Sequence, residues 1–287
     1  MTSPPRTVGA LRETIDRAAE DGGATAVAVA YHDYGSDTGW ELRGDEWFHA
    51  ASTIKVPILL ALYAEIDAGR LSEHSRLHVR NRFVSAADSL PYRVSAERDA
   101  NARVHAMRGK TMRVHDLAEP MIATSSNLAT NLLLDFVGPE RCMEVMGQAG
   151  IRGVEVKRGV EDERAWEAGI NNRVTAGGLR DLFRVIAEKE VLSGEVHEAM
   201  LDILHAQRFR SGIPAGLPDD ARVAHKTGEI STVAHDAGIV FLPGRAPYVV
   251  VILTRWDADT TTGRRETIAR ISRLVYEHLT GGEDRDG

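Results

Sequence analysis

A serine and a lysine stand three residues apart, as Ser52 and Lys55, directly before the apolar run Val56–Leu62. In a helix, residues i and i+3 lie on one face, so this spacing lets the hydroxyl and the amine meet. If a helix begins at Ser52, the free backbone N–H groups of its first turn point at whatever the hydroxyl attacks. An amine desolvated by apolar neighbours can lose its proton near neutral pH and act as a base. The pair therefore suits nucleophilic catalysis, although a capping serine followed by a solvated lysine gives the same pattern.

Two other short motifs carry groups that suit acyl chemistry. The segment 125–127, Ser-Ser-Asn, lies where two predicted helices meet, and such a junction can project a hydroxyl and an amide into a cleft. The segment 226–228, Lys-Thr-Gly, lies on a predicted strand, where the lysine offers positive charge and the threonine a hydroxyl. The small glycine lets a substrate approach the backbone. Each motif also fits a helix cap or an exposed strand face, but three motifs in this order seldom arise together by chance.

The elements that position these motifs are strands at both ends of the chain and helices between them. Helical periodicity predicts a first helix over 8–22, a buried helix over 54–68 and a final helix over 262–279. Compact apolar runs predict strands over 24–32, 39–48, 222–229, 235–242 and 247–256. The rest of the chain, up to about residue 204, consists of helices and loops.

This order predicts an α+β fold in which one antiparallel sheet is built from both termini, with terminal helices flanking it. We expect a discontinuous α/β sheet domain formed by residues 1–51 and 206–287. Residues 52–205 are expected to form an inserted all-α domain. The active site would lie in the cleft between these two domains.

Composition indicates a soluble globular protein. The chain has 287 residues, of which 43% are apolar and 27% charged, with a formal net charge of −7. The basic residues are scattered, which argues against nucleic-acid binding as the main task. Cys142 is the only cysteine, so the chain has no intramolecular disulfide and no cysteine-based zinc site. His74 and His78 have i, i+4 spacing, but no third ligand is evident and no metal site is expected.

The N-terminal residues contain no apolar core of signal-peptide length. No run approaches the roughly 20 apolar residues of a membrane span. We expect a cytoplasmic monomer that acts on a small-molecule substrate, without nucleic-acid or membrane partners. If the native N-terminus has been trimmed, we expect an exported protein instead.

Taken together, Ser-x-x-Lys, Ser-x-Asn and Lys-Thr-Gly resemble the signature of serine β-lactamases and penicillin-binding proteins. The segment 122–134, Ile-Ala-Thr-Ser-Ser-Asn-Leu-Ala-Thr-Asn-Leu-Leu-Leu, is similar to the class A β-lactamase sequence around the second motif. The resemblance extends from the first predicted helix to the last. It implies a β-lactamase/transpeptidase-like fold and a serine hydrolase that forms an acyl-enzyme with a β-lactam or a similar cyclic amide or ester. Such chemistry needs no cofactor.

The resemblance implies a catalytic role for four side chains. Ser52 would be the nucleophile, and Lys55 would activate it as a base or proton relay. Ser125 would pass a proton to the leaving nitrogen, helped by the positive charge of Lys226.

The resemblance also implies the substrate-binding groups. Asn127 would hold the amide side chain of the substrate and Thr227 its carboxylate, while Gly228 leaves room for the substrate beside the strand. The backbone N–H groups of Ser52 and Glu229 would form the oxyanion hole, in which one donor is typically worth about 3–4 kcal/mol.

A carboxylate that aims water at the acyl ester is implied as well, and the sequence offers two. Class A enzymes use a glutamate followed four residues later by an asparagine, and Glu167 with Asn171 matches that local pattern. Distance along the chain from Ser125 instead favours Glu161. At most one of these acids can have this role, and either could simply be solvated.

Three features depart from the class A pattern. Ser126 stands where class A enzymes carry an acid. The segment Arg82–Gly109 lengthens the gap between the first two motifs, and we expect it to lie over the mouth of the cleft and reshape substrate access. His235-Asp236 stands where many class A enzymes place a carboxylate-binding arginine.

These departures leave two other functions open. One is a related acyl hydrolase with another task, such as a cytosolic esterase or a D-Ala-D-Ala peptidase. The other is a binding module that is acylated but never released, as in a sensor, or a pseudoenzyme without activity.

Overall fold

The computed structural model describes residues 7–281 and divides them into two compact units. The described parts of Met1–Thr53, Thr175–Arg184 and Phe209–Gly287 form one unit, here called the sheet unit. Ile54–Val174 and Val185–Arg208 form the other, here called the helical unit. Within residues 7–281, no helix is both long and apolar enough to cross a membrane.

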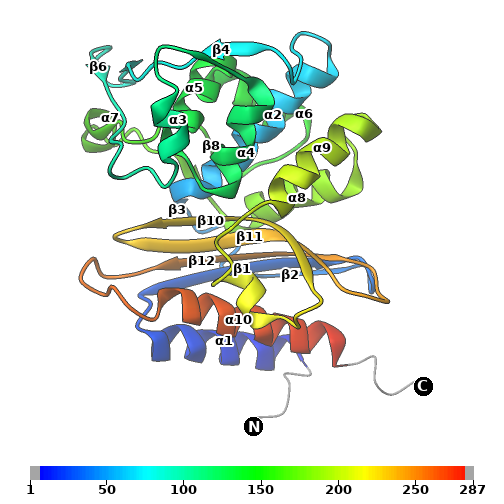
Figure 1. The fold of residues 1–287 in the computed structure, drawn as a ribbon. Coiled ribbons are helices and arrows are strands. Elements are labelled where there is room, and N and C mark those ends of the chain that lie inside the picture. The colour runs from blue at the N-terminus through cyan, green and yellow to red at the C-terminus, as the bar shows by residue number, and fades with distance from the viewer. Residues whose placement is uncertain (1–6, 282–287) are drawn as a thin grey trace. The chain divides into compact units, whose positions relative to one another are not determined.

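The sheet unit is built on a five-stranded antiparallel sheet with the strand order β10-β11-β12-β1-β2 (Figure 1). Its strands are β1 (Ala26–Asp33), β2 (Thr38–Leu42), β10 (Arg222–Ile230), β11 (Val233–Phe241) and β12 (Tyr248–Arg255). Strand β1 pairs along its whole length with β12, from Ala26 opposite Arg255 to Asp33 opposite Tyr248. Residues from both ends of the chain thus share one sheet, which confirms the predicted α+β fold.

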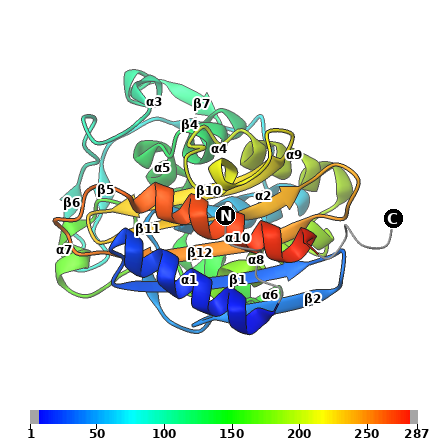
Figure 2. The same cartoon turned by 90° about the horizontal axis from the view of Figure 1, so that it is seen from below.

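Two terminal helices, α1 (Val8–Gly22) and α10 (Arg264–Thr280), lie side by side along one face of this sheet (Figures 1 and 2). Each turns an apolar stripe of i, i+3 and i+4 residues toward the strands. The core that they cover includes Leu11, Ile15, Ile268, Ile271 and Val275, all buried. The short helix η2 (Ile213–Gly216) packs against α10 on the same side.

The observed division of the chain differs from the predicted one at Thr175–Arg184, which belongs to the sheet unit although the prediction placed it in the domain 52–205. This segment opens α8 (Ala176–Glu188). The backbone N–H of Gly177 donates to the carbonyl of Gly44 at 2.8 Å, and Arg180 pairs with Glu41. These long-range contacts hold the start of the helix on the sheet unit, and local periodicity carries no sign of them.

The helical unit is organised around α2 (Lys55–Asp67), which is buried at nine consecutive positions from its first residue. A helix that is apolar on all sides must be surrounded by other elements. Helices from the same unit supply that cover: α2 contacts α4 (Val114–Ala123), α5 (Asn127–Val137), α6 (Pro139–Gln148) and α9 (Gly194–His205). Pro57 is tolerated because it lies in the first turn, where its missing N–H would have no partner.

The remaining elements of the helical unit are short. Helices α3 (Ala102–Ala106) and α7 (Glu163–Glu167) have one or two turns. Small antiparallel pairs join β4 (Arg76–His78) to β7 (Thr111–Arg113), β5 (Phe83–Val84) to β6 (Pro91–Tyr92), and β8 (Val154–Glu155) to β9 (Arg173–Val174). Strands of two or three residues are too short for a period-2 pattern, so the sequence did not predict them.

Candidate active site

The helical unit carries a polar cluster around the buried amine of Lys55, the first residue of α2. Its Nζ donates to the carbonyl oxygen of Ser125 at 2.7 Å, to Ser125 Oγ at 2.9 Å and to Asn127 Oδ1 at 2.9 Å. All three acceptors are oxygen atoms of the second motif. One lysine therefore holds two residues of the second motif in place.

The turn between α4 and α5 presents those two residues. Ser125 has φ 58°, a left-handed conformation that is strained for a non-glycine residue and persists where the surroundings enforce it. The next residue, Ser126, donates its N–H to the carbonyl of Pro120 at 2.9 Å and is the N-cap of α5, where its Oγ accepts from Ala129 N at 3.3 Å. The cap directs the backbone so that Ser125 and Asn127 both reach Lys55.

Glu161 extends this cluster beyond Asn127. The Nδ2 of Asn127 donates to Glu161 Oε1 at 2.8 Å. The other carboxylate oxygen accepts from the backbone N–H of Ser95 at 2.9 Å and from the guanidinium of Arg98 at 3.2 Å. Only 10% of the Glu161 side chain is exposed. A carboxylate is thus linked to the lysine through a single amide.

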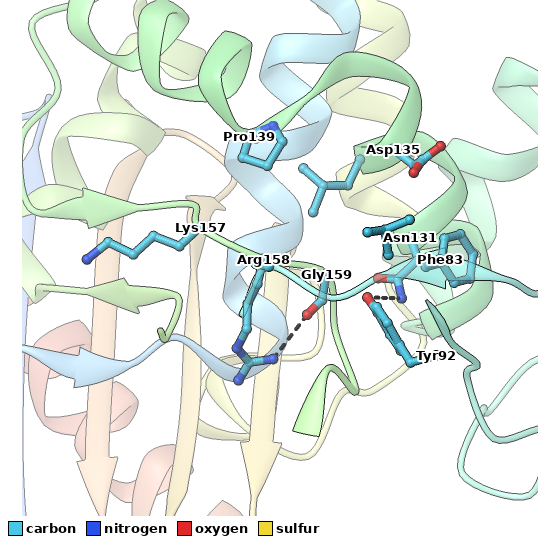
Figure 3. A pocket seen from close by; sticks show the side chains of 11 residues that line it. Phe83, Tyr92, Asn131, Asp135, Pro139, Lys157, Arg158 and Gly159 are labelled. Atoms are coloured by element: carbon cyan, nitrogen blue, oxygen red, sulfur yellow. Dashed lines mark hydrogen bonds between the residues drawn. The ribbon is translucent and has the colours of Figure 1, made fainter. Parts of the chain in front are cut away.

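The loop that carries Glu161 is anchored by Asn131 on α5. Its Oδ1 accepts from Val160 N at 2.8 Å and its Nδ2 donates to Val160 O at 2.9 Å, so the side chain pairs with that backbone as a strand would. Behind the loop is a cavity of about 120 Å³, where Asn131 also donates to the Tyr92 hydroxyl at 3.1 Å (Figure 3). A Cβ at Gly159 would lie 2.1 Å from that hydroxyl, so only glycine fits there.

The second candidate acid lies elsewhere on the same loop. Glu167 is the last residue of α7 and its side chain is exposed. Asn171 accepts from the guanidinium of Arg158 at 2.9 Å. The structure therefore brings Glu161, and not Glu167, into hydrogen-bond contact with Asn127. The residue four positions after Glu161 is Ala165, so an asparagine at that spacing is absent.

The third motif lies on β10 in the sheet unit. Lys226 is buried and its Nζ donates to the carbonyl oxygen of Thr227 at 2.8 Å. Burial lowers the pKa of Lys226 to about 7, and the negative charge of Asp236 opposes that shift. Thr227 is partly exposed. The neighbouring Glu229 is exposed and pairs with Arg265 at 2.9 Å, so of this residue only the backbone N–H is a candidate for the site.

Gly228 brings this strand close to the backbone of the first motif, within the same unit. A Cβ at Gly228 would lie 3.0 Å from the backbone nitrogens of both Ser52 and Thr53. Ser52 lies in the 3-10 helix η1 (Ala51–Ile54), and α2 begins only at Lys55. Ser52 therefore lies in a tighter turn that precedes the α-helix, and the buried helix predicted over 54–68 is observed as α2.

His235 and Asp236 on β11 face Gly228 and Thr227 across the strand pair. His235 is buried, which lowers its pKa to about 4, so it is neutral at pH 7 and cannot provide the charge of an arginine. Its Nε2 donates to the carbonyl of His49 at 2.9 Å. Asp236 bonds the Nδ1 of buried His225 at 2.8 Å and accepts from the backbone N–H of Ile213 at 2.8 Å. The sequence did not predict this buried pair.

A model of the β-lactamase enzyme family matches residues 10–279 of the chain. The chain belongs to the β-lactamase enzyme family. It is 29% identical to a β-lactamase of Kitasatospora aureofaciens over 92% of this chain and 84% of that one. This membership confirms the predicted serine hydrolase of the β-lactamase type.

Solved structures of the β-lactamase family agree. A mutant of PBP-A in an acyl-enzyme complex with penicillin G superposes with a TM-score of 0.80 at 26% identity, covering 98% of this chain and all of that one. An ancestral class A β-lactamase superposes with a TM-score of 0.80 at 26% identity, covering 93% of this chain and 99% of that one. The predicted β-lactamase/transpeptidase-like fold is therefore confirmed.

Two side chains of this β-lactamase-family site were missed by the sequence analysis. Asn131 follows Asn127 by four residues on one helix, and that spacing could have indicated it. Arg98 lies in the polar segment Arg82–Gly109, which shows no periodicity, and no local signal marks it. Within residues 7–281, no group of three or more His, Cys, Asp or Glu side chains could hold a metal ion.

Proposed function

We propose that this β-lactamase-family chain hydrolyses β-lactams through an acyl-enzyme on Ser52. The observation that carries the proposal is the hydrogen-bonded series Ser125–Lys55–Asn127–Glu161, which links a proton donor for the first step to a base for the second. The acyl-enzyme of the PBP-A mutant with penicillin G supports the choice of substrate class.

Acylation begins when Ser52 Oγ attacks the carbonyl carbon of the lactam. As the carbon–nitrogen bond of the ring breaks, Ser125 gives its proton to the ring nitrogen, Lys55 gives one to Ser125 Oγ, and the proton of Ser52 then replaces it on Lys55. The 2.9 Å separation of Lys55 Nζ and Ser125 Oγ suits such a transfer. The proton count of the lysine is the same before and after the step. Backbone N–H groups of Ser52 and Glu229 stabilise the oxyanion.

Hydrolysis of the acyl-enzyme then uses Glu161. Its carboxylate takes a proton from water, whose oxygen bonds to the ester carbon, and the proton returns to Ser52 Oγ as the ester bond breaks. Asn127 keeps Oε1 of this carboxylate oriented through its amide N–H. The proposal gives Glu167 no part in the reaction, because Glu161 contacts Asn127 whereas the Glu167 side chain is exposed at the end of α7.

The second and the third motif supply the substrate-binding groups in this proposal. Asn127 holds the amide side chain of the substrate, while Thr227 and the cationic form of Lys226 bind its carboxylate. Gly228 leaves the edge of β10 open to the substrate, because any side chain there would meet the backbone of Ser52 and Thr53.

Intact-protein mass spectrometry after mixing with a penicillin, a cephalosporin and a small activated ester tests the proposal. We expect a mass increase by one substrate on the wild type, followed by release of hydrolysed product. The variant Ser52→Ala should show neither adduct nor product. Turnover by that variant, or an adduct from the ester alone, would reject the β-lactam proposal, and a lasting penicillin adduct without product would indicate an acylated sensor.

A further inference from the structure

The segment 95–101 lies in the polar excursion of the helical unit and carries a buried carboxylate. The side chain of Asp99 is fully buried and accepts four hydrogen bonds. Two come from its own segment and from α3: Asn101 N at 2.9 Å and His105 Nε2 at 3.1 Å. The other two come from the turn before α5: Ser126 Oγ at 3.0 Å and Leu128 N at 2.9 Å.

The last two contacts make Asp99 part of the cap of α5. Ser126 is the N-cap and satisfies Ala129 N with its own hydroxyl. Asp99 satisfies the N–H of Leu128, which would otherwise have no partner in the first turn. A carboxylate at this position also interacts favourably with the positive end of the helix dipole. The residues that Asp99 holds directly flank Ser125 and Asn127.

Other residues of the segment hold the remaining part of the same site. Ser95 N and Arg98 both donate to Glu161 Oε2. The Nδ2 of Asn101 donates to Thr124 Oγ1 at 2.9 Å, and Thr124 immediately precedes Ser125. Within seven residues the chain thus contacts both the turn that carries the proton donor and the carboxylate proposed as the base.

We propose that Asp99 is a positioning residue for the reaction, and that the segment 95–101, here called the strap, fixes the α4–α5 turn relative to Glu161. This inference rests on the proposed function. The strap supplies from 27 residues upstream a carboxylate that Ser126 does not provide. Asp99 acts on acylation, because it holds the turn with Ser125, whereas Arg98 acts on release of the product, because it holds Glu161.

The matched variants are Asp99→Asn and Arg98→Ala, with acylation and release measured separately by stopped-flow and mass spectrometry. Asp99→Asn replaces two charged acceptor oxygens by one neutral oxygen and an NH2 group. The NH2 group opposes either the N–H of Asn101 or the donors of Ser126 and Leu128, so acylation should slow about ten- to hundredfold, as expected for a displacement of about 1 Å. Release should change less. Arg98→Ala should show the opposite pattern. Equal effects of both variants on both steps would overturn the proposal.

A control separates positioning from general loss of stability. Glu65→Gln removes another carboxylate of the helical unit that is held by two arginines, Arg70 and Arg141, without touching the strap. Below the melting temperature of all variants, this control should acylate like the wild type. The double variant Asp99→Ala with Ser126→Asp moves the carboxylate to the cap position itself. It should acylate at least tenfold faster than the single variant Asp99→Ala. Equal acylation rates of these two variants would contradict a positioning role.

Should Asp99→Asn fail to fold, Thr124→Val provides a second test, since it keeps the shape of the side chain and removes the hydroxyl that accepts from Asn101 and donates to the carbonyl of Pro120 at 3.1 Å. It should slow acylation at least about fivefold, the factor that corresponds to about 1 kcal/mol, the contribution of one neutral hydrogen bond. Acylation at the wild-type rate in this variant would count against the strap.

Amide hydrogen exchange tests the role of Asp99 independently of the proposed function. Loss of the Asp99 contact should speed amide exchange across 126–130 at least tenfold in Asp99→Asn and leave it unchanged in Glu65→Gln. If the wild type forms no adduct with any substrate, the proposed function fails, and the exchange result alone decides whether Asp99 holds the turn. Unchanged exchange in Asp99→Asn would overturn the proposal even in an active enzyme.

Discussion

The helical unit and the sheet unit each bury a lysine completely, and each surrounds it in a different way. Lys55 donates to three oxygens from one turn, so its ammonium group serves as a geometric centre. Lys226 lies on a strand, where burial lowers its pKa to about 7 and the charge of Asp236 counteracts that shift. Lys55 orients its neighbours through hydrogen bonds, whereas the surroundings of Lys226 set its pKa. Substitutions at or near the two lysines should therefore affect activity in different ways.

The largest effect is expected for Lys55→Met. It removes the amine that joins Ser125 to Asn127, so both proton transfer and the geometry of the turn are lost. Acylation should fall about 10³- to 10⁴-fold, at the upper range for general acid–base catalysis. Stopped-flow measurement with a chromogenic cephalosporin provides the rate. Lys189→Met, at an exposed lysine paired with Glu198, is the matched control and should retain full activity.

Glu161→Gln should affect the second step instead of the first. The amide can still accept from Asn127, but it cannot take a proton from water, so release should slow about 10²- to 10³-fold while acylation stays near the wild-type rate. The acyl-enzyme would then accumulate and be visible by mass spectrometry. Glu167→Gln is the control. Accumulation in that variant, with normal turnover in Glu161→Gln, would reverse the assignment of the base.

In the sheet unit, Gly228→Ala should displace the backbone that carries the nucleophile. The added Cβ would lie 3.0 Å from the nitrogens of Ser52 and Thr53, which is closer than ordinary packing allows. We expect acylation to fall about tenfold, since small displacements of reacting groups are costly. Gly147→Ala, in helix α6 with open space around its Cα, should leave the rate unchanged. Equal rates in both variants would show that β10 tolerates a side chain at this position.

The smallest effect concerns pH. If the cationic form of Lys226 is required, kcat/KM should fall as pH rises through about 7, where this lysine loses its proton. Asp236 raises the pKa of Lys226, so Asp236→Asn should lower it and move the fall to lower pH. At pH 7 this amounts to a loss of several-fold in activity, since one pKa unit is tenfold in protonation. Asp257→Asn, an exposed control, should leave the profile in place; an unshifted profile in Asp236→Asn would show that another group controls it.

Much of the fold could be predicted because its signals are local. Apolar runs such as Tyr248–Thr254 predict strands, and the stripe of Ile268, Ile271 and Val275 predicts the last helix, whatever their partners are. The boundary at Thr175–Arg184 could not be predicted, because it depends on contacts with Gly44 and Glu41, more than a hundred residues away.

The sequence by itself determined which residue types stand at the three motifs, since Ser-x-x-Lys, Ser-x-Asn and Lys-Thr-Gly are defined by spacing alone. Only the tertiary structure decided which acid contacts Asn127. Glu167 has the better local pattern, with Asn171 four residues on, yet Glu161 makes the contact because Asn131 pairs with the backbone of Val160 and turns that part of the loop inward. Asp99 could not be predicted for the same reason, because the two partners through which it holds the turn, Ser126 and Leu128, are 27 and 29 residues away.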